Sequence, residues 1–209
     1  MLPVLCVKRP IFPGTRKILR ITSLANLELI DRYVLPKDKP WSIGIVPLKH
    51  PLPISLKAKA EKFGWQSIGH PLQEKVLETA WKGTQIGVEA RISRISTIAP
   101  DTYALSVVGI SRFWIRSVER CAFGGWIAKD VERFNDEKNE NEQAVWKKIS
   151  VLSKRQFNQE TSSERASFLL AEQYAASLTS EQLEQILGSR NVGERISVLE
   201  SLSEREVES

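Results

Sequence analysis

Cysteine and histidine are scarce in this chain of 209 residues, which contains two of each. Two cysteines, Cys6 and Cys121, are too few for a scaffold held together by disulfides. The histidines, His50 and His70, each stand beside a proline and apart from both cysteines. Side chains scattered in this way lack the spacing of a zinc site. The sequence therefore predicts no bound metal.

Long apolar runs and nucleotide-binding loops are also missing. No apolar stretch approaches the roughly 20 residues that a membrane-spanning helix needs, and Lys8 and Arg9 interrupt the apolar start too early for a signal peptide. The pattern Gly-x-x-x-x-Gly-Lys-Ser/Thr, whose backbone would cradle phosphates, does not occur. A pair of nucleophile and base is not recognisable either. We expect a protein with no cofactor, no membrane partner and no catalysis of its own.

The net charge of +5 also bears on the possible partners. Most of the excess lysine and arginine lies in the first half of the chain, whereas the last stretch is acidic. This balance permits a nucleic acid or an acidic peptide as partner without requiring one. A solvated basic surface is the simplest interpretation.

The most regular pattern in the chain lies between residues 83 and 120. Apolar and polar residues alternate over Ile86–Ile92, as in a strand with one buried face. The alternation slips near Arg94, which predicts a β-bulge. A turn follows at 99–101, a second alternating run comes next, and a third follows Gly109. The sequence thus predicts a meander of three antiparallel strands at the centre of a β domain.

Further strands and helices surround this meander. Apolar runs predict strands over 2–7, 18–21, 41–47 and 126–131, and Ser23 is the expected N-cap of a helix. From Glu142 the apolar spacing becomes helical. We therefore predict an α+β protein in two parts: a β domain over 1–134, interrupted by a long proline- and lysine-rich insertion at about 48–82, and a helical bundle over 135–209. The wholly polar stretch 135–141 is interpreted as the hinge between the two parts.

Two capping boxes predict helix starts near the end of the chain. Thr179 and Gln182 have the spacing at which each side chain binds the other's backbone N–H. Ser203 and Glu206 repeat this spacing where only three residues follow, too few for a helix that could offset its own nucleation. We interpret the second box as the start of a longer helix, and the chain as the N-terminal region of a larger protein.

Four short blocks resemble the N-terminal domain of Lon-type ATP-dependent proteases. The blocks are Leu-Pro-Val-Leu at 2–5, Phe-Pro-Gly at 12–14, Ile-Gly-Val-Glu-Ala at 86–90 and Gly-Ile-Ser-Arg-Phe-Trp-Ile at 109–115. Their order and spacing are similar to those of the family, and the resemblance covers nearly the whole chain. Asn26–Leu29, in the first predicted helix, resembles the peroxisomal branch of the family.

The resemblance implies a fold, a function and partners. The fold is a PUA-like antiparallel β domain followed by a helical bundle. The function is non-catalytic recognition of unfolded or damaged protein substrates, together with a contribution to oligomer assembly. The implied partners are unfolded proteins and either the ATPase and protease module of Lon or further copies of the chain. The implied location is the peroxisomal matrix for the peroxisomal branch, and the cytoplasm or mitochondria otherwise.

Aromatic residues are the candidates for contact with such a substrate, namely Phe12, Phe63, Trp65 and Trp114. Phe63 and Trp65 lie in the insertion, which is interpreted either as a flap that clamps an unfolded segment or as a small core that covers one edge of the sheet. Trp114 stands out of phase with its neighbours, so it projects from the opposite face of its strand. On that face it either lines a peptide groove or packs against helices.

Two other functions are compatible with the sequence. PUA-like folds include RNA-binding members, and the basic first half would suit electrostatic capture of RNA. No RNA-recognition motif is present, so nucleic acid is the less favoured partner. The second alternative is a free-standing adaptor that uses the same fold as cereblon does, to recruit a partner protein.

Overall fold

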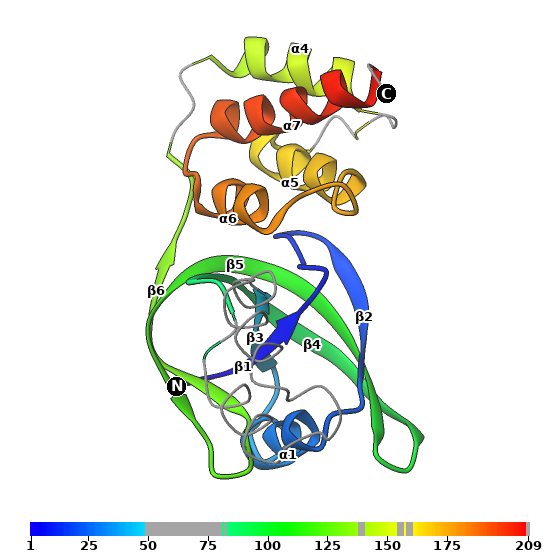
Figure 1. Ribbon diagram of the computed structural model, residues 1–209, viewed down its shortest axis with the longest axis vertical. Helices are drawn as coiled ribbons and strands as arrows, with labels where there is room; N and C mark the ends of the chain where they lie inside the picture. The colour runs from blue at the N-terminus through cyan, green and yellow to red at the C-terminus, as the bar shows by residue number, and fades with distance from the viewer. Residues whose placement is uncertain (49–80, 82, 138–140, 154–156, 158–160, 208–209) are drawn as a thin grey trace, which may run out of the picture.

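The structure is a computed structural model that describes residues 1–48, 81, 83–137, 141–153, 157 and 161–207. Its strands are β1 (Leu2–Val7), β2 (Arg16–Ile21), β3 (Trp41–Pro47), β4 (Ile86–Ala99), β5 (Thr102–Arg120) and β6 (Trp126–Phe134). Its helices are α1 (Leu24–Tyr33), α4 (Glu142–Leu152), α5 (Ser163–Gln173), α6 (Ser180–Gly188) and α7 (Val192–Val207). Helices α4 to α7 gather at one end of the strands, and α1 lies at the opposite end (Figure 1).

The strands form one mixed sheet that closes into a small barrel. Their order is β2-β5-β4-β3-β1-β6, and β6 pairs again with β5. β1 and β3 are parallel, whereas the other strand pairs among the described residues are antiparallel. The predicted α+β class is confirmed, with one parallel pair inside a sheet that was expected to be antiparallel. β2 pairs only with the first half of β5, so among the described strands it stands at an open edge.

The predicted meander is two long strands rather than three. β4 and β5 meet in the predicted turn, where Asp101 has a φ of 54°, and the register shifts between Ile92 and Arg94, at the predicted bulge. The predicted break after Gly109 is wrong, because β5 continues to Arg120. Glycine at position 109 instead lets the backbone of Phe12 pack closely, because a Cβ there would lie 2.3 Å from the carbonyl oxygen of Phe12.

Two apolar clusters fill the structure. The smaller one lies on one face of the sheet and is formed by Leu2, Val4, Val46, Phe113, Ile115 and Ala128. The larger one lies on the other face of the sheet and runs without interruption from α1 and the strands into α5, α6 and α7. The predicted division at residue 134 stays a prediction, since this larger cluster crosses it.

The helical part follows its sequence signals, with one exception. The box at Thr179 is confirmed, since the Gln182 N–H donates to the threonine hydroxyl (3.2 Å) and the Thr179 N–H donates to the Gln182 side chain (2.9 Å). Asn191 caps α7 through the Gly193 N–H (2.7 Å). The box at Ser203 begins no new helix, because α7 already runs through it to Val207. In the described part of the chain no helix is long and apolar enough to cross a membrane.

Candidate functional site

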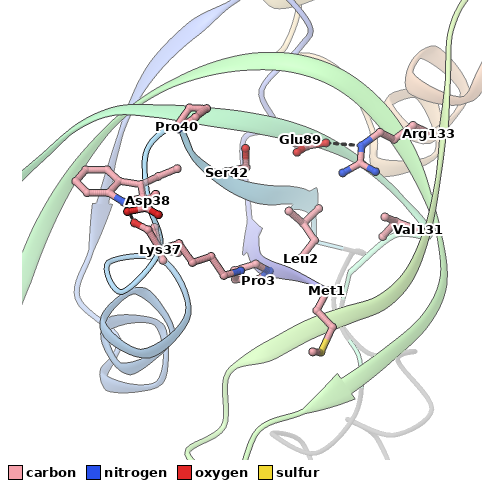
Figure 2. Close-up of a pocket in the computed structure, with 12 residues that line it drawn as sticks. Met1, Leu2, Pro3, Lys37, Asp38, Pro40, Ser42, Glu89, Val131 and Arg133 are labelled. Atoms are coloured by element: carbon pink, nitrogen blue, oxygen red, sulfur yellow. Dashed lines mark hydrogen bonds and ion pairs between the residues drawn. The ribbon is translucent and has the colours of Figure 1, made fainter.

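A pocket of about 230 Å³ opens at the mouth of the barrel (Figure 2). Its walls come from the start of β1, the segment between α1 and β3, the first two residues of β3, one residue of β4 and two of β6. The lining residues are Met1, Leu2, Pro3, Val34, Lys37, Asp38, Pro40, Trp41, Ser42, Glu89, Val131 and Arg133. More than half of them are apolar, and the charged ones carry both signs.

The topology explains why these segments meet. β1 and β3 run parallel, with Val4 opposite Gly44, so both strands begin at the same edge of the barrel. β6 is antiparallel to β1 and pairs Ala128 with Leu2, which brings its later residues past the start of β1. The loop after α1 then returns the chain to Trp41, at the first position of β3.

Hydrogen bonds and charged groups hold the side chains at the rim of the pocket in place. Arg133 donates from Nε to Glu89 at 2.6 Å, and this hydrogen bond raises the pKa of the arginine above its ordinary value. The Trp41 indole N–H donates to the carbonyl of Lys37 (2.9 Å), and the Lys39 ammonium lies 4.7 Å from the centre of the indole ring. The ring is therefore held in place while it remains half-buried. Such a wall suits apolar contact with a ligand of variable sequence.

The predicted aromatic residues lie elsewhere. Phe12 is fully buried and stacks on Phe168 with ring centres 6.3 Å apart, so it offers no surface to a peptide. Trp114 is half-buried, stacks on Phe134 (5.8 Å between ring centres) and faces Gly188 of α6. This is the packed position against the helices that the sequence left as one alternative. Phe63 and Trp65 fall outside the described residues.

The residue that sequence reasoning missed is Trp41. It entered the sequence-based predictions only as the first residue of the strand over 41–47, because a tryptophan at the start of a strand does not by itself indicate a pocket. Lys39, two residues before Trp41, gave a weak signal, since a nearby cation can be attracted to the face of an aromatic ring. The pocket itself could not be foreseen, because its walls come from five separate segments.

A second polar site joins the barrel to the helices. Arg112 of β5 and Arg195 of α7 both bind the carboxylate of Asp136, and all three side chains are at most 6% exposed. The Arg195 Nη1 to Asp136 Oδ1 distance is 2.8 Å. The guanidinium of Arg112 also donates to the carbonyl of Leu187 at 2.9 Å, and that of Arg195 to the hydroxyl of Ser167 at 3.0 Å. The cluster thus ties β5, α5, α6 and α7 together.

Aromatic rings and burial set the electrostatics of this cluster. The guanidinium carbon of Arg195 lies 4.3 Å, and that of Arg112 5.1 Å, from the centre of the Phe168 ring. Burial lowers the pKa of Arg112 to about 10, against the opposing attraction of Asp136. Burial, followed by repulsion from Asp136, raises the pKa of Glu164. These groups are enclosed by protein and bind protein, so we interpret the cluster as structural.

The described start of 135–141, the stretch interpreted as a hinge, is held by contacts to β5 and to the helical part. Residues 138–140 lie outside the described part of the chain, so the hinge as a whole stays a prediction. Asp136 pairs with two buried arginines, and the Glu137 N–H donates to the carbonyl of Arg190 (2.9 Å). Over the described ranges, no group of three His, Cys, Asp or Glu side chains could hold a metal ion.

Comparisons with known proteins give one family and one fold. The family model described as the substrate-binding domain of ATP-dependent protease La (LON) matches residues 1–204. A Lon N-terminal domain protein from Xanthomonas campestris is similar in structure, with a TM-score of 0.61 and 16% identity over 96% of each chain. The N-terminal domain of a Mycobacterium avium complex Lon protease has a TM-score of 0.60 and 18% identity over 97% of each chain. The comparison with curated proteins gave no match.

Proposed function

The chain belongs to the family of Lon substrate-binding domains, and on that premise we propose that it recognises unfolded segments of its substrates at the barrel-mouth pocket. Domains of this family are non-catalytic and serve substrate recognition at the N-terminus of Lon. The proposal adds the state of the substrate and the place where it binds.

The single observation behind the proposal is the mixed lining of the pocket. Apolar walls of Leu2, Val34 and Val131 stand beside the half-buried ring of Trp41, so an apolar side chain of many shapes can enter. A folded protein keeps such side chains inside its own core, whereas an unfolded one exposes them. Lys37, Asp38 and the Glu89–Arg133 pair at the rim supply charge of both signs for the flanking residues.

The context of this recognition is also part of the proposal. The domain works with an ATPase and protease module of the Lon type, which would pull and cut the segment that the domain has bound. Self-association of the domain would place several pockets around one substrate and raise the apparent affinity without new contacts. The resemblance of Asn26–Leu29 to the peroxisomal branch supports a peroxisomal location.

The pocket can be tested by filling it. Ser42→Trp places a large ring into the cavity from a strand position whose side chain faces it (Figure 2). We expect the affinity for an unfolded protein to fall by about tenfold or more, which corresponds to about 1.4 kcal/mol. The measurement is fluorescence anisotropy with a labelled disulfide protein kept unfolded by reduction and carboxamidomethylation.

The matched control is Ser117→Trp, the same substitution at an exposed position of β5 outside the pocket. Both variants should keep the melting temperature of the unchanged chain within a few degrees. Equal affinity of all three proteins for the unfolded probe would remove the pocket from the proposal.

A further inference from the structure

The face of the sheet that points away from the larger apolar cluster carries two rows of arginine. Arg16 and Arg20 project from β2, Arg91 and Arg94 project from β4, and all four are exposed. Between them runs β5, whose residues in the same register are Val108, Ser106 and Ala104. The cross-strand rows Arg16–Val108–Arg91 and Ile18–Ser106–Arg94, together with the pair Arg20–Ala104, place these side chains on one face. We call this surface the arginine face; it comprises Arg16, Ile18, Arg20, Arg91, Arg94 and the three β5 residues.

The arginine face has a positive charge that nothing described on it neutralises. None of its four arginines forms an ion pair with a described acidic side chain. Glu89, two residues before Arg91 on the same strand, is held by Arg133 at 2.6 Å. The rows stand about 10 Å apart, because they are separated by two strand spacings of about 4.8 Å. Between the rows lie the half-buried β5 side chains Val108, Ser106 and Ala104.

The backbone of β2 offers a second kind of contact. The Gly109 N–H donates to the carbonyl of Thr15 (3.0 Å), one pair before Arg16 and Val108. In an antiparallel pair the residues alternate in the side to which their backbone groups turn. The N–H and C=O groups of Arg16, Ile18 and Arg20 therefore point away from β5. No described strand pairs with that side, so these groups can receive an added strand.

Resting on the proposed function, we infer that the arginine face binds an extended acidic segment of a substrate, which adds to β2 as a further strand. Residues opposite each other across two strands interact directly. The segment would place acidic residues opposite Arg16 and Arg20 and an apolar residue opposite Ile18, which is 74% exposed. The preferred pattern is therefore acidic-x-apolar-x-acidic.

The same observations favour polypeptide over nucleic acid. The arginine face has no aromatic side chain on which a base could stack. The free N–H and C=O groups of β2 repeat at the spacing of a polypeptide strand. The exposed Ile18 between two arginines suits an apolar side chain better than a phosphate.

The charge of the occupant is tested with two peptides. One capped, labelled peptide contains Glu-Thr-Val-Thr-Glu, and its partner contains Gln-Thr-Val-Thr-Gln. We expect the glutamate peptide to bind the whole chain about tenfold more tightly at low ionic strength, from two exposed charge pairs and their neighbours. The variant Arg16→Glu with Arg20→Glu should lose this preference. The variant Lys8→Glu with Arg9→Glu changes the net charge equally at exposed positions outside the face and should keep it.

The added strand is tested with Ile18→Pro. Proline removes an N–H that faces the open edge, which an edge strand tolerates, so the melting temperature should change little while the glutamate peptide loses about tenfold in affinity. Ile18→Ala is the control that keeps the N–H. Equal binding of the two peptides, or an equal loss in the Lys8/Arg9 variant, would overturn the inference. Tighter binding of a single-stranded oligonucleotide through Arg16 and Arg20 would overturn it in favour of nucleic acid.

Failure of this inference can be told apart from failure of the proposed function. If the peptide results are negative while the carboxamidomethylated protein still binds and Ser42→Trp still weakens it, only the arginine face is at fault. If the chain binds neither probe, the proposed function falls as well.

Discussion

Replacing Asp136 by alanine is expected to lower the free energy of unfolding by about 3–5 kcal/mol, the usual cost of breaking a buried ion pair from one side. Asp136 is 6% exposed and is the carboxylate that both Arg112 and Arg195 bind. Without it, two buried guanidiniums lose the carboxylate that binds both of them. Urea denaturation followed by circular dichroism measures the change, and the melting temperature should fall by about 10 °C.

The control is Asp130→Ala, the same substitution at an exposed position of β6. An exposed side chain of this kind should change stability by no more than about 0.5 kcal/mol. Asp136→Asn, which keeps the shape but removes the charge, should lie between the two. A loss of less than 1 kcal/mol in Asp136→Ala would show that the arginines find other partners and that the cluster does not hold the barrel to the helices.

Replacing Phe168 by alanine should destabilise the domain by about 3–5 kcal/mol, since removal of a fully buried ring costs transfer energy and leaves a cavity. The ring is 0% exposed, stacks on Phe12 and lies under the guanidiniums of Arg112 and Arg195. The same denaturation experiment measures the loss. Phe168→Leu keeps most of the volume but no aromatic face, and should cost clearly less.

The two substitutions should not be additive. Residues that share partners in one network show interaction energies of about 0.5–3 kcal/mol in double-mutant cycles. Asp136→Ala removes the group that fixes both guanidiniums, so loss of the Phe168 ring should cost less unfolding free energy in that background. If the double variant loses as much unfolding free energy as the two single variants together, the Phe168 ring is not energetically coupled to the arginine cluster.

Local patterns in the sequence predicted the strands and most helix starts. Alternation over Ile86–Ile92 and the box at Thr179 are signals that neighbouring residues carry by themselves, and both agree with the structure. The break expected after Gly109 failed, because the glycine makes room for the backbone of Phe12. Only the fold shows which segment approaches that closely.

The arginine cluster and the candidate surfaces depend on contacts between residues that are far apart in the sequence, and the sequence alone does not display such contacts. Asp136 stands in a polar stretch whose other charges look the same, and its partners lie 24 and 59 residues away. Phe12 was a candidate for substrate contact, but the Thr15 hydroxyl forms hydrogen bonds with the Phe12 N–H (3.1 Å) and carbonyl (2.8 Å), and the ring is buried. Likewise, Arg16 and Arg91 become neighbours only through the register of β2, β5 and β4.

The two proposed surfaces divide the work of recognition. The barrel-mouth pocket accepts an apolar side chain, and the arginine face accepts an extended acidic stretch. Both are features of a chain that has lost its own fold, since a folded substrate offers neither a free backbone nor exposed core residues. A segment that bound the pocket and the arginine face at once would bind more tightly than at either surface alone, because the second contact would be intramolecular.

The central claim is that this domain distinguishes an unfolded chain from a folded one. The direct test is the affinity of the purified 209-residue chain for one small disulfide protein in two forms, native and reduced with blocked thiols, by fluorescence anisotropy. We predict that the reduced form binds at least about tenfold more tightly, a difference of about 1.4 kcal/mol. Equal affinity for the two forms, or tighter binding of the native form, would contradict the claim.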